Sequence, residues 1–383
     1  MPTTLRDKAA ICGIGQIPFT TNSGMTEIEM LLRASAEAIE DAGLKRGDID
    51  GVIALSANTT AEEYISNLGL KNVRFSSSIL RFDALNIISL MHAAMAVATG
   101  QARYVLVAQG RNFSSERGTT LGRHEGGVPQ MRKAREFNFI YGESTSLIHH
   151  ALAMREHMDH YGTTERSLAK IVVNQRRHAS LNPNALIRKP MTEAQYFKQP
   201  YLAEPLRVPD HYIYADGGSA WVVGLASEAR NAKKRPVFIS GVAMTFPDYA
   251  YSYSGLLQDT GESQSARAVR NAYKMAGVTI KDMDFAQLYD SFPMLVILQI
   301  PSTGICTAKE VAQWLESTSM AFDGGGLPVN THGGHIAQGM ASGHSHVVEA
   351  VLQLRGEATN RQVKNAEIGL VVAVDGAAVV LRR

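Results

Sequence analysis

The clearest pattern along the chain is an apolar run, then an Ala-rich helical stretch, then a glycine and an acidic turn. It occurs twice. AAICGIG precedes residues 33–50 (RASAEAIEDAGLKRGDID), and VFISGVAM precedes residues 267–284 (RAVRNAYKMAGVTIKDMD). Small residues suit a helix that packs closely on a sheet, and glycine commonly ends a helix. This self-similarity favours a duplicated α/β domain over two ordinary strand–helix–strand units. An ungapped alignment matches Arg33, Ala34, Ala38, Ala42, Gly43, Asp48 and Asp50 to Arg267, Ala268, Ala272, Ala276, Gly277, Asp282 and Asp284.

The strand predicted after the second acidic turn runs into a polar cluster. GVIAL follows the first turn, whereas FAQLY follows the second and continues into DSFP. Tyr289 and Asp290 therefore lie where a strand ends and a helix begins. Ligands of α/β folds bind in the crevice at the carboxyl ends of strands, so we expect both residues at the edge of a site. The alternatives are a half-buried tyrosine at a strand end for Tyr289 and a helix cap for Asp290.

Between the two copies lie a further unit and an irregular segment. FDALNIISLMHAAMAVATGQARYVLVAQG predicts a small-residue helix, a glycine end at Gly100 and a buried strand. Residues 115–210 are rich in Arg, His, Asn and Pro, with a helix predicted near 143–161. We interpret this segment as an insertion that covers the first half and contributes substrate contacts.

Composition narrows the class of protein. The 383 residues are 45% apolar and 19% charged, with a net charge of +2, which is typical of a globular protein with a large core. No basic stripe indicates nucleic acid, no apolar run approaches the ~20 residues of a membrane span, and the N-terminus lacks the order of a signal peptide. Two cysteines without a C-x-x-C motif predict a reduced, cytoplasmic protein.

A histidine-rich segment near the C-terminus, NTHGGHIAQGMASGHSH, is the second candidate for chemistry. No cysteine or paired carboxylate accompanies the histidines, so we expect substrate contacts and no metal in this chain. Its glycines would let the backbone approach a bound substrate closely. Arg176 could meet a phosphate of a ligand or could belong to a solvated helix face. The residues of the segment that we single out are His332, Gly333, Gly334, His335, His344 and His346.

The order of several motifs resembles the thiolase superfamily. GIGQIPF, AAMAVATGQARYVLVAQGRN, YADGGSAW, LYDSF, NTHGGHIAQG and EAVLQLRG occur in sequence, and the likeness covers essentially the whole chain. More narrowly, they are similar to the lipid-transfer-protein, or sterol-carrier-type, branch. The resemblance implies a duplicated thiolase fold of two α/β/α/β/α halves with mixed five-stranded sheets. The halves would be residues 1–235, with a loop domain at about 115–210, and residues 236–383.

The same resemblance implies acyl-CoA substrates and partners. Members usually form homodimers, through a strand that corresponds here to YVLVAQGRN. Many also bind a small zinc-ribbon/OB-fold subunit, which would give a heterotetramer.

The catalytic residues of thiolases are replaced in this sequence. The position of the nucleophilic Cys falls on Asp83, that of the Asn or His of the next motif on Tyr289, and the late Cys has no counterpart. Gly-His-Pro becomes Gly339, Met340 and Ala341. A steroid side-chain aldolase of this branch also lacks the cysteines and uses tyrosines at the Y-D-x-F and Gly-His-Pro positions. This chain keeps Tyr289 but has Met340.

Three functions follow from the resemblance. The first is cleavage of a C–C bond in a β-hydroxyacyl-CoA by a cysteine-independent retro-aldol route. The second is acyl transfer to or from an aromatic or branched β-oxoacyl-CoA, and the third is a non-catalytic subunit that binds acyl-CoA or a partner. For the first, we predict the catalytic residues Tyr289, Asp83, His335, His346 and Asp290, and contacts to coenzyme A from Gly333, Gly334, Arg176 and His344.

Overall fold

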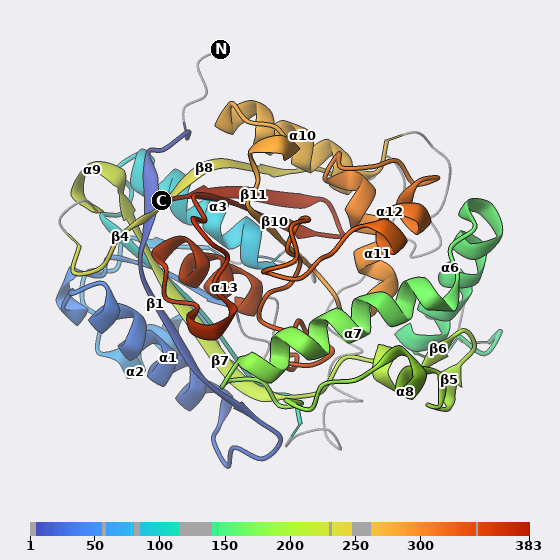
Figure 1. The fold of residues 1–383 in the computed structure, drawn as a ribbon. Helices are drawn as coiled ribbons and strands as arrows, with labels where there is room; N and C mark the ends of the chain where they lie inside the picture. The colour runs from blue at the N-terminus through green and yellow to red at the C-terminus, as the bar shows by residue number, and fades with distance from the viewer. Residues whose placement is uncertain are drawn as a thin grey trace.

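A single mixed sheet runs through the chain and folds into two layers (Figure 1). The computed structural model describes residues 5–55, 59–77, 79, 85–114, 140–143, 145–229, 232–246, 262–341 and 344–383. The strand order is β3 (Phe75–Ser76), β2 (Gly51–Leu55), β4 (Tyr104–Asn112), β7 (Asp216–Leu225), β1 (Ala9–Thr20), β8 (Val237–Met244), β11 (Ala377–Arg382), β10 (Ile368–Ala373) and β9 (Phe285–Leu288).

Helices fill and cover the two sheet layers. Helices α3 (Leu85–Ala98) and α13 (His344–Arg355) share a core with both layers, where Trp221 of β7 and Val379 of β11 are buried. Helices α1 (Glu27–Asp41) and α10 (Gln264–Ala276) cover the outer faces. The order helix, sheet, helix, sheet, helix confirms the predicted five-layered fold.

The two halves have the same strand connectivity. In the first, β1 pairs with β7 antiparallel and β2 with β4 parallel; in the second, β8 pairs with β11 antiparallel and β9 with β10 parallel. The first half contributes five strands and the described second half four. Beyond β9, a parallel bridge between Ala286 and Val329 occupies the place that β3 takes beside β2. The duplication predicted from the sequence is therefore confirmed.

The residues shared by the two copies have shared structural roles. A Cβ at Gly13 would lie 2.2 Å from the carbonyl oxygen of Ala38, and one at Gly241 would lie 2.1 Å from that of Ala272. Only glycine lets the strand approach the helix so closely. Asp50 likewise accepts backbone N–H bonds at the start of β4, as Asp284 does at the start of β10.

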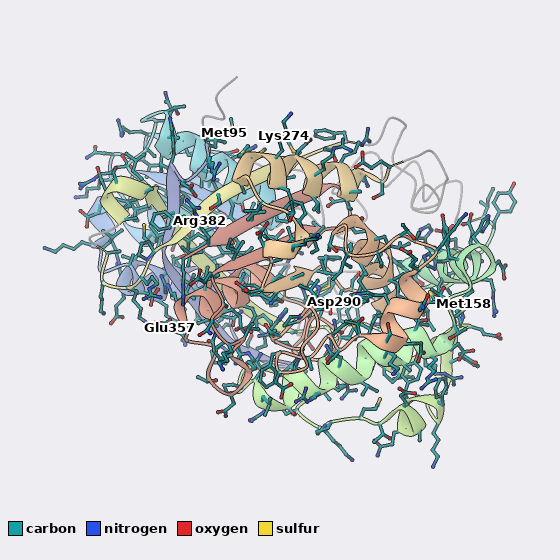
Figure 2. All side chains as sticks on the ribbon, turned by 45° about the horizontal axis from the view of Figure 1, so that its top comes forward. Met95, Met158, Lys274, Asp290, Glu357 and Arg382 are labelled. Atoms are coloured by element: carbon teal, nitrogen blue, oxygen red, sulfur yellow. The ribbon has the colours of Figure 1, made fainter. Side chains whose placement is uncertain are left out.

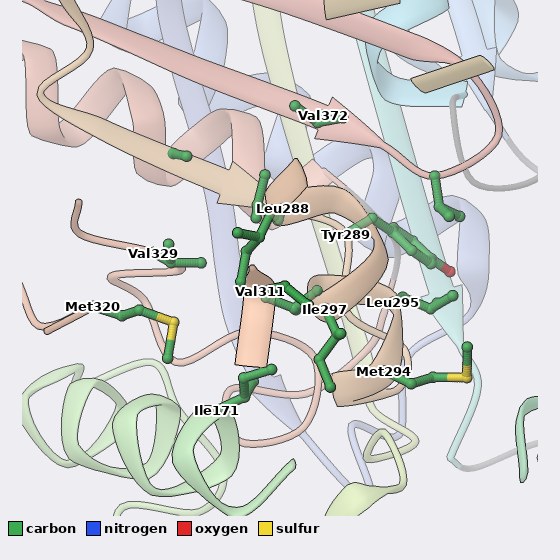
Figure 3. Close-up of a cluster of buried hydrophobic side chains, with 14 of the residues drawn as sticks. Ile171, Leu288, Tyr289, Met294, Leu295, Ile297, Val311, Met320, Val329 and Val372 are labelled. Carbon is green, nitrogen blue, oxygen red and sulfur yellow. The ribbon is translucent and has the colours of Figure 1, made fainter. Parts of the chain in front are cut away.

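The middle segment packs on the second half, not on the first as we expected. Its helices are α6 (Ser146–Tyr161), α7 (Glu165–Leu181) and α8 (Glu193–Phe197), with the hairpin β5 (Tyr201–Ala203) and β6 (Leu206–Arg207). Helix α7 contacts α11 (Pro293–Ser302) and α12 (Val311–Ser317). Ile171 of α7 shares a buried cluster with Leu288 and Ile297 (Figure 3). The insertion therefore lies against the Y-D-S-F turn.

Two further features bear on assembly. Strand β4 pairs with β2 on one edge and with β7 on the other, so β4 itself has no free edge that could continue the sheet into a second copy. The homodimer itself stays a prediction.

Among the described residues, every helix is too short or too polar to cross a bilayer. The other helices of the described residues are the short α2 (Ala61–Leu68) and α9 (Ala226–Ala229). Described 3-10 turns lie at 46–48, 208–210, 280–282 and 359–361.

Candidate functional site

Tyr289 and Asp290 directly follow β9 in a turn that is held from both sides. The Tyr289 N–H donates to Val372 of the neighbouring strand, and the side chain of Gln299 in α11 bonds both the N–H and the carbonyl of Tyr289. The N-cap of α11 is Phe292. Asp290 is therefore not the cap of this helix, and its carboxylate is used elsewhere.

The Asp290 carboxylate is fully buried and joins three segments of the chain (Figure 2). It accepts hydrogen bonds from the His335 backbone N–H at 3.0 Å, from Gln175 Nε2 at 2.9 Å and from His346 Nε2 at 3.0 Å. A Cβ at Gly334 would lie 1.9 Å from Asp290 Oδ2, and its backbone φ is +64°. Glycine at this position therefore lets the loop close over the carboxylate.

His346 is held with one nitrogen bonded and the other bare. Its Nε2 faces two acceptors, Asp290 Oδ1 at 3.0 Å and the carbonyl oxygen of Leu288 at 3.1 Å, so Nε2 carries the proton in the neutral ring. Its Nδ1 is buried and has no hydrogen-bond partner among the described residues. A carboxylate that orients an imidazole with a bare nitrogen is an arrangement suited to proton transfer.

The other histidines of the loop pack around His346. The His335 and His332 rings each lie 4.7 Å from the His346 ring between centroids, in edge-on geometry. The Tyr289 ring meets His335 edge-on at 5.1 Å. The structure thus brings together Tyr289, Asp290, His335 and His346, which the sequence singled out. His332 joins them.

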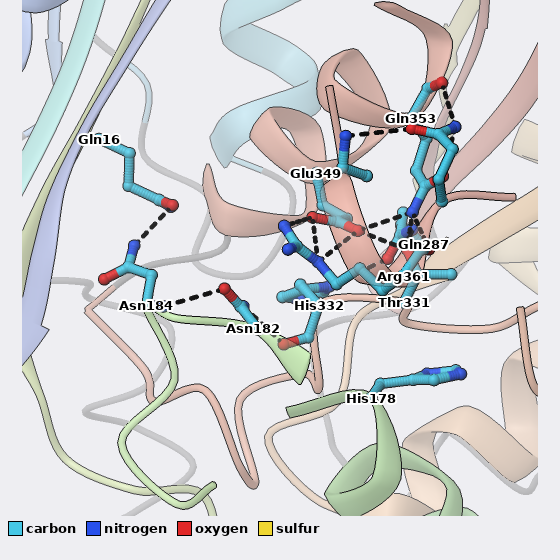
Figure 4. Close-up of polar contacts among 12 residues, drawn as sticks. Gln16, His178, Asn182, Asn184, Gln287, Thr331, His332, Glu349, Gln353 and Arg361 are labelled. Carbon is cyan, nitrogen blue, oxygen red and sulfur yellow. Dashed lines mark hydrogen bonds and ion pairs between the residues drawn. The ribbon is translucent and has the colours of Figure 1, made fainter. Parts of the chain in front are cut away.

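A chain of hydrogen bonds determines which nitrogen of His332 carries its proton (Figure 4). Thr331 Oγ1 donates to Glu349, so it must accept the bond from Gln287 Nε2. The Gln287 carbonyl oxygen then faces His332 Nδ1 at 3.1 Å, which must donate to it. Arg361 holds Glu349 in a buried ion pair at 2.7 Å.

His332 is consequently kept neutral. Burial holds its pKa well below the usual range, and the nearby charges of His346, His335 and Arg361 lower it further. Its Nε2 is a buried lone pair without a hydrogen-bond partner among the described residues. A group in this state can accept a proton or a hydrogen bond but cannot donate one from Nε2.

Tyr289 has a cationic neighbour that the sequence did not reveal. Its ring is buried, and its hydroxyl is directed away from Leu288 and Ile297 (Figure 3). Burial lowers the pKa of the Arg111 guanidinium, while the charges of Glu27 and Tyr289 raise it, which places Arg111 within electrostatic reach of the phenol. A nearby cation favours the ionised form of a phenol.

Four other predicted residues have separate outcomes. Asp83 lies outside the described residues, and of His344 only the backbone, at the start of α13, is described. Gly333 is buried against Ala179 of α7, with a φ of +102°. Arg176 is buried, and its Nε has no hydrogen-bond partner among the described residues, so it does not belong to a solvated face. Contacts of these residues to coenzyme A stay predictions.

Both cysteines are poor nucleophiles in this structure. Burial raises the pKa of the Cys12 thiol to about 12 and that of Cys306 to about 11. Cys12 lies in the core beneath α1, and Cys306 follows α11. Because the thiolate is the reactive form, neither residue is suited to covalent catalysis at neutral pH.

The same cluster has the composition of a metal site. Asp290, His335 and His346 each offer a ligand atom, and these atoms lie within 4.8 Å of one another. The Asp290 oxygens already accept the three donors described above, and His346 Nε2 carries the proton of one of them. These ligand atoms are therefore engaged in hydrogen bonds in this structure, and the absence of a metal from this chain stays a prediction.

Gln175 and Arg111 are the residues that sequence reasoning missed. Gln175 belongs to a helix in the middle segment and Arg111 to strand β4 of the first half. Arg111 lies within the stretch AAMAVATGQARYVLVAQGRN, but nothing in that pattern marks it as part of a site. The one signal in the sequence was that Gln175 adjoins Arg176, in a helix already expected to lie near the substrate.

Comparisons with known proteins agree with the fold and show the family. The family described as "Thiolase C-terminal domain-like" matches residues 253–380. The chain is 32% identical to 17-hydroxy-3-oxo-4-pregnene-20-carboxyl-CoA lyase of Mycobacterium tuberculosis, over 97% of each chain. It is 30% identical to the steroid side-chain-cleaving aldolase of Thermomonospora curvata, over 94% of this chain and 93% of the relative. Among solved structures, the Ltp2-ChsH2(DUF35) aldolase superposes with a TM-score of 0.90 at 28% identity, covering 99% of this chain and 98% of that one.

Proposed function

Because this chain belongs to the thiolase superfamily, in its sterol-carrier-type branch, we propose that it cleaves a C–C bond of a β-hydroxyacyl-CoA by a retro-aldol route. The observation that carries the proposal is the buried cluster of Tyr289, Asp290, His335 and His346, which contains neither cysteine: Cys12 is buried beneath α1 and Cys306 is partly buried after α11. Two relatives named as a CoA-thioester lyase and an aldolase support the same reaction class.

The reaction needs a group that moves a proton twice. A base takes the proton of the β-hydroxyl, its oxygen forms the new carbonyl, and the bond between Cα and Cβ breaks. The electron pair passes to the thioester as an enolate, and a proton then forms the new Cα–H bond. We assign the first transfer to Tyr289, whose ring packs against His335 and His346 in the buried cluster. The Tyr289 phenol formed in this step then returns the proton to Cα, so the protons balance, and His346, oriented by Asp290, packs beside the Tyr289 ring.

Acyl transfer of the thiolase type is a weaker alternative. It needs a thiolate that holds the acyl group covalently. The raised pKa of Cys12 and of Cys306 leaves both thiols protonated at neutral pH. An aspartate such as Asp83 would give only a reactive anhydride.

The decisive experiment compares two substrates in one preparation. The protein is incubated with a β-hydroxyacyl-CoA alone and, separately, with a β-oxoacyl-CoA plus free coenzyme A. We expect a carbonyl compound and a shorter acyl-CoA from the first mixture, with one deuterium at Cα when the reaction runs in D₂O. Turnover of only the second mixture would overturn the proposal. Alkylation with iodoacetamide is the control and should leave the cleavage rate unchanged.

We further propose that the chain works as a homodimer bound to a zinc-ribbon/OB-fold subunit, with coenzyme A entering only as the thioester substrate. The solved relative, the Ltp2-ChsH2(DUF35) aldolase, is named for two components, which supports a partner. Light scattering of the chain alone at micromolar concentration should give twice its mass of 41.6 kDa. A monomeric mass would count against the homodimer.

A further inference from the structure

We propose that Arg176 of α7 is an oxyanion-binding residue and holds a negatively charged oxygen group of the thioester substrate. This inference rests on the function proposed above and adds a chemical feature of the substrate. The oxyanion belongs to a carboxylate of the acyl part or to a phosphate of coenzyme A. A guanidinium recognises both with the same fork of N–H donors.

The charge of Arg176 is buried and unbalanced. The residue is 9% exposed, and its Nε is enclosed without a hydrogen-bond partner among the described residues. Burial lowers the pKa of the guanidinium, and no neighbouring carboxylate acts in the opposite direction. An uncompensated charge inside a protein lowers the free energy of unfolding. A side chain that costs stability at its position is expected to serve a ligand.

Two other buried arginines show how this fold balances such a charge. Arg355, which is also 9% exposed, forms an ion pair with Asp41 at 2.6 Å. Arg361 is 5% exposed and forms an ion pair with Glu349 at 2.7 Å. Arg176 is buried to the same extent as Arg355 but has no such carboxylate among the described residues. The missing anion is therefore assigned to a ligand.

The position of Arg176 on α7 brings it beside the cluster around Asp290. The buried side of this helix also carries Gln175, whose Nε2 donates to Asp290 at 2.9 Å. Consecutive Cα atoms are about 3.8 Å apart, so the Arg176 side chain begins next to a direct partner of Asp290. The histidine-rich loop packs one turn further along, since a Cβ at Gly333 would lie 2.6 Å from the Cβ of Ala179. A substrate whose reacting centre lies at the cluster can thus extend to Arg176.

A ligand can reach the guanidinium although the residue is buried. Of its three nitrogens, only Nε is both enclosed and without a partner. The two terminal nitrogens have no hydrogen bond or ion pair among the described residues and are not fully enclosed, so an oxyanion can approach them. Because little water competes at this position, a charge-assisted hydrogen bond there is stronger than one on the surface.

The experiment measures the binding of unreactive thioether probes by calorimetry. The probes are S-propyl-coenzyme A, S-carboxypropyl-coenzyme A and S-propyl-pantetheine, which lacks the phosphates. Arg176→Gln removes the charge and keeps a polar side chain, so it should weaken binding of a probe that carries the recognised oxyanion about 10–100-fold. If the oxyanion is an acyl carboxylate, only S-carboxypropyl-coenzyme A loses affinity. If it is a phosphate, both coenzyme A probes lose affinity equally and S-propyl-pantetheine does not.

The neighbouring residue provides the matched control. Arg177 is exposed and forms a surface ion pair with Asp323 at 2.7 Å, so Arg177→Gln should bind every probe as the wild type does. Arg176→Lys keeps the charge but loses the fork, and it should recover part of the lost affinity. The melting temperature of Arg176→Gln should not fall, because no described ion pair is lost.

Three results would overturn the inference. The first is a wild type that binds neither coenzyme A probe, and the second is unchanged binding of all probes by Arg176→Gln. The third is equal weakening of all three probes, the uncharged S-propyl-pantetheine included, which would show a merely structural role. If the wild type cleaves no β-hydroxyacyl-CoA, the proposed function fails, and selective loss of an anionic probe in Arg176→Gln still tests the oxyanion site separately.

Discussion

The two halves of the molecule share a scaffold and differ where their equivalent strands end. Extending the ungapped alignment pairs Leu55, the last residue of β2, with Tyr289, directly after β9. The two positions are almost equally buried, at 5% and 6% exposed. One copy places an apolar side chain there, and the other places a phenol followed by a buried carboxylate. The fold thus provides two equivalent positions, and of these two only the second carries an ionisable side chain.

This difference shows that the candidate site is formed by segments that pack around the second copy, and not by the residues that the two copies share. The shared residues, such as Gly13 with Gly241 and Asp50 with Asp284, join strands to helices in both halves. The residues around Asp290 come from the middle segment and the histidine-rich loop, outside the residues that the repeat matches.

Tyr289→Phe should give the largest effect. Removing the hydroxyl keeps the ring packed against His335, so kcat should fall about 10²–10⁴-fold while the melting temperature stays unchanged. The control in the first half is Tyr64→Phe, which removes a buried hydroxyl bonded to Ser35. It should cost about 1 kcal/mol of unfolding free energy and leave kcat unchanged. Full activity in Tyr289→Phe would show that the Y-D-S-F turn has only a structural role at the end of the strand.

Gly13→Ala and Gly241→Ala test the scaffold that the halves share. Each new Cβ would collide with a helix carbonyl, at 2.2 Å and 2.1 Å, so each should lower the unfolding free energy by about 1–3 kcal/mol. Urea denaturation measures both. Gly47→Ala is the control, because nothing lies within 4 Å of its Cβ position. A large cost in one half and none in the other would contradict the structural equivalence.

His178 should make the free energy of unfolding depend on pH, through hydrogen bonds that join α7 to the second half. Its Nδ1 donates to the Asn330 carbonyl and its Nε2 accepts the Phe322 N–H, so both nitrogens are used in the neutral ring. Burial lowers its pKa from 6.5 to about 4. Between these values the unfolded chain binds the proton and the folded chain does not, so the stabilisation is present above pH 6.5 and is lost as the pH falls toward 4.

From pH 7 to pH 5 this group should cost about 2 kcal/mol of unfolding free energy, measured by urea denaturation at each pH. His178→Gln cannot titrate and should show a correspondingly smaller loss. His160→Gln, at an exposed histidine of α6, is the control and should follow the wild type. Identical pH profiles for wild type and His178→Gln would refute the assignment.

Cysteine substitution should have the smallest effect. Cys12→Ala in the first half and Cys306→Ala in the second remove thiols that burial keeps protonated, so kcat should stay within a few-fold. The initial rate of β-hydroxyacyl-CoA cleavage measures it. A loss of more than about tenfold in kcat in either variant, with unchanged stability, would indicate that this cysteine takes part in the reaction.

Much of the fold could be predicted because the repeat lies in local, contiguous residues. Each shared residue acts within its own strand–helix unit, as the glycine end at Gly43 and Gly277 does, with the same φ of +72°. The strand end at Tyr289 was predictable for the same reason. The face covered by the insertion was predicted wrongly, because the apolar pattern of α7 shows which side is buried but not which partner buries it.

By itself, the sequence determined the duplicated α/β scaffold, the loss of the thiolase cysteines and the position of Tyr289 and Asp290 at a strand end. Only the tertiary structure decided that Asp290 orients His346 and that Arg111 lies near Tyr289. It also decided that burial keeps His332 neutral and that Gln287 fixes its proton on Nδ1. A local sequence pattern predicts the secondary structure of neighbouring residues. Protonation and orientation depend on groups that are distant in the chain and meet only in the packed interior, where hydrogen bonds and burial leave each polar atom a single role.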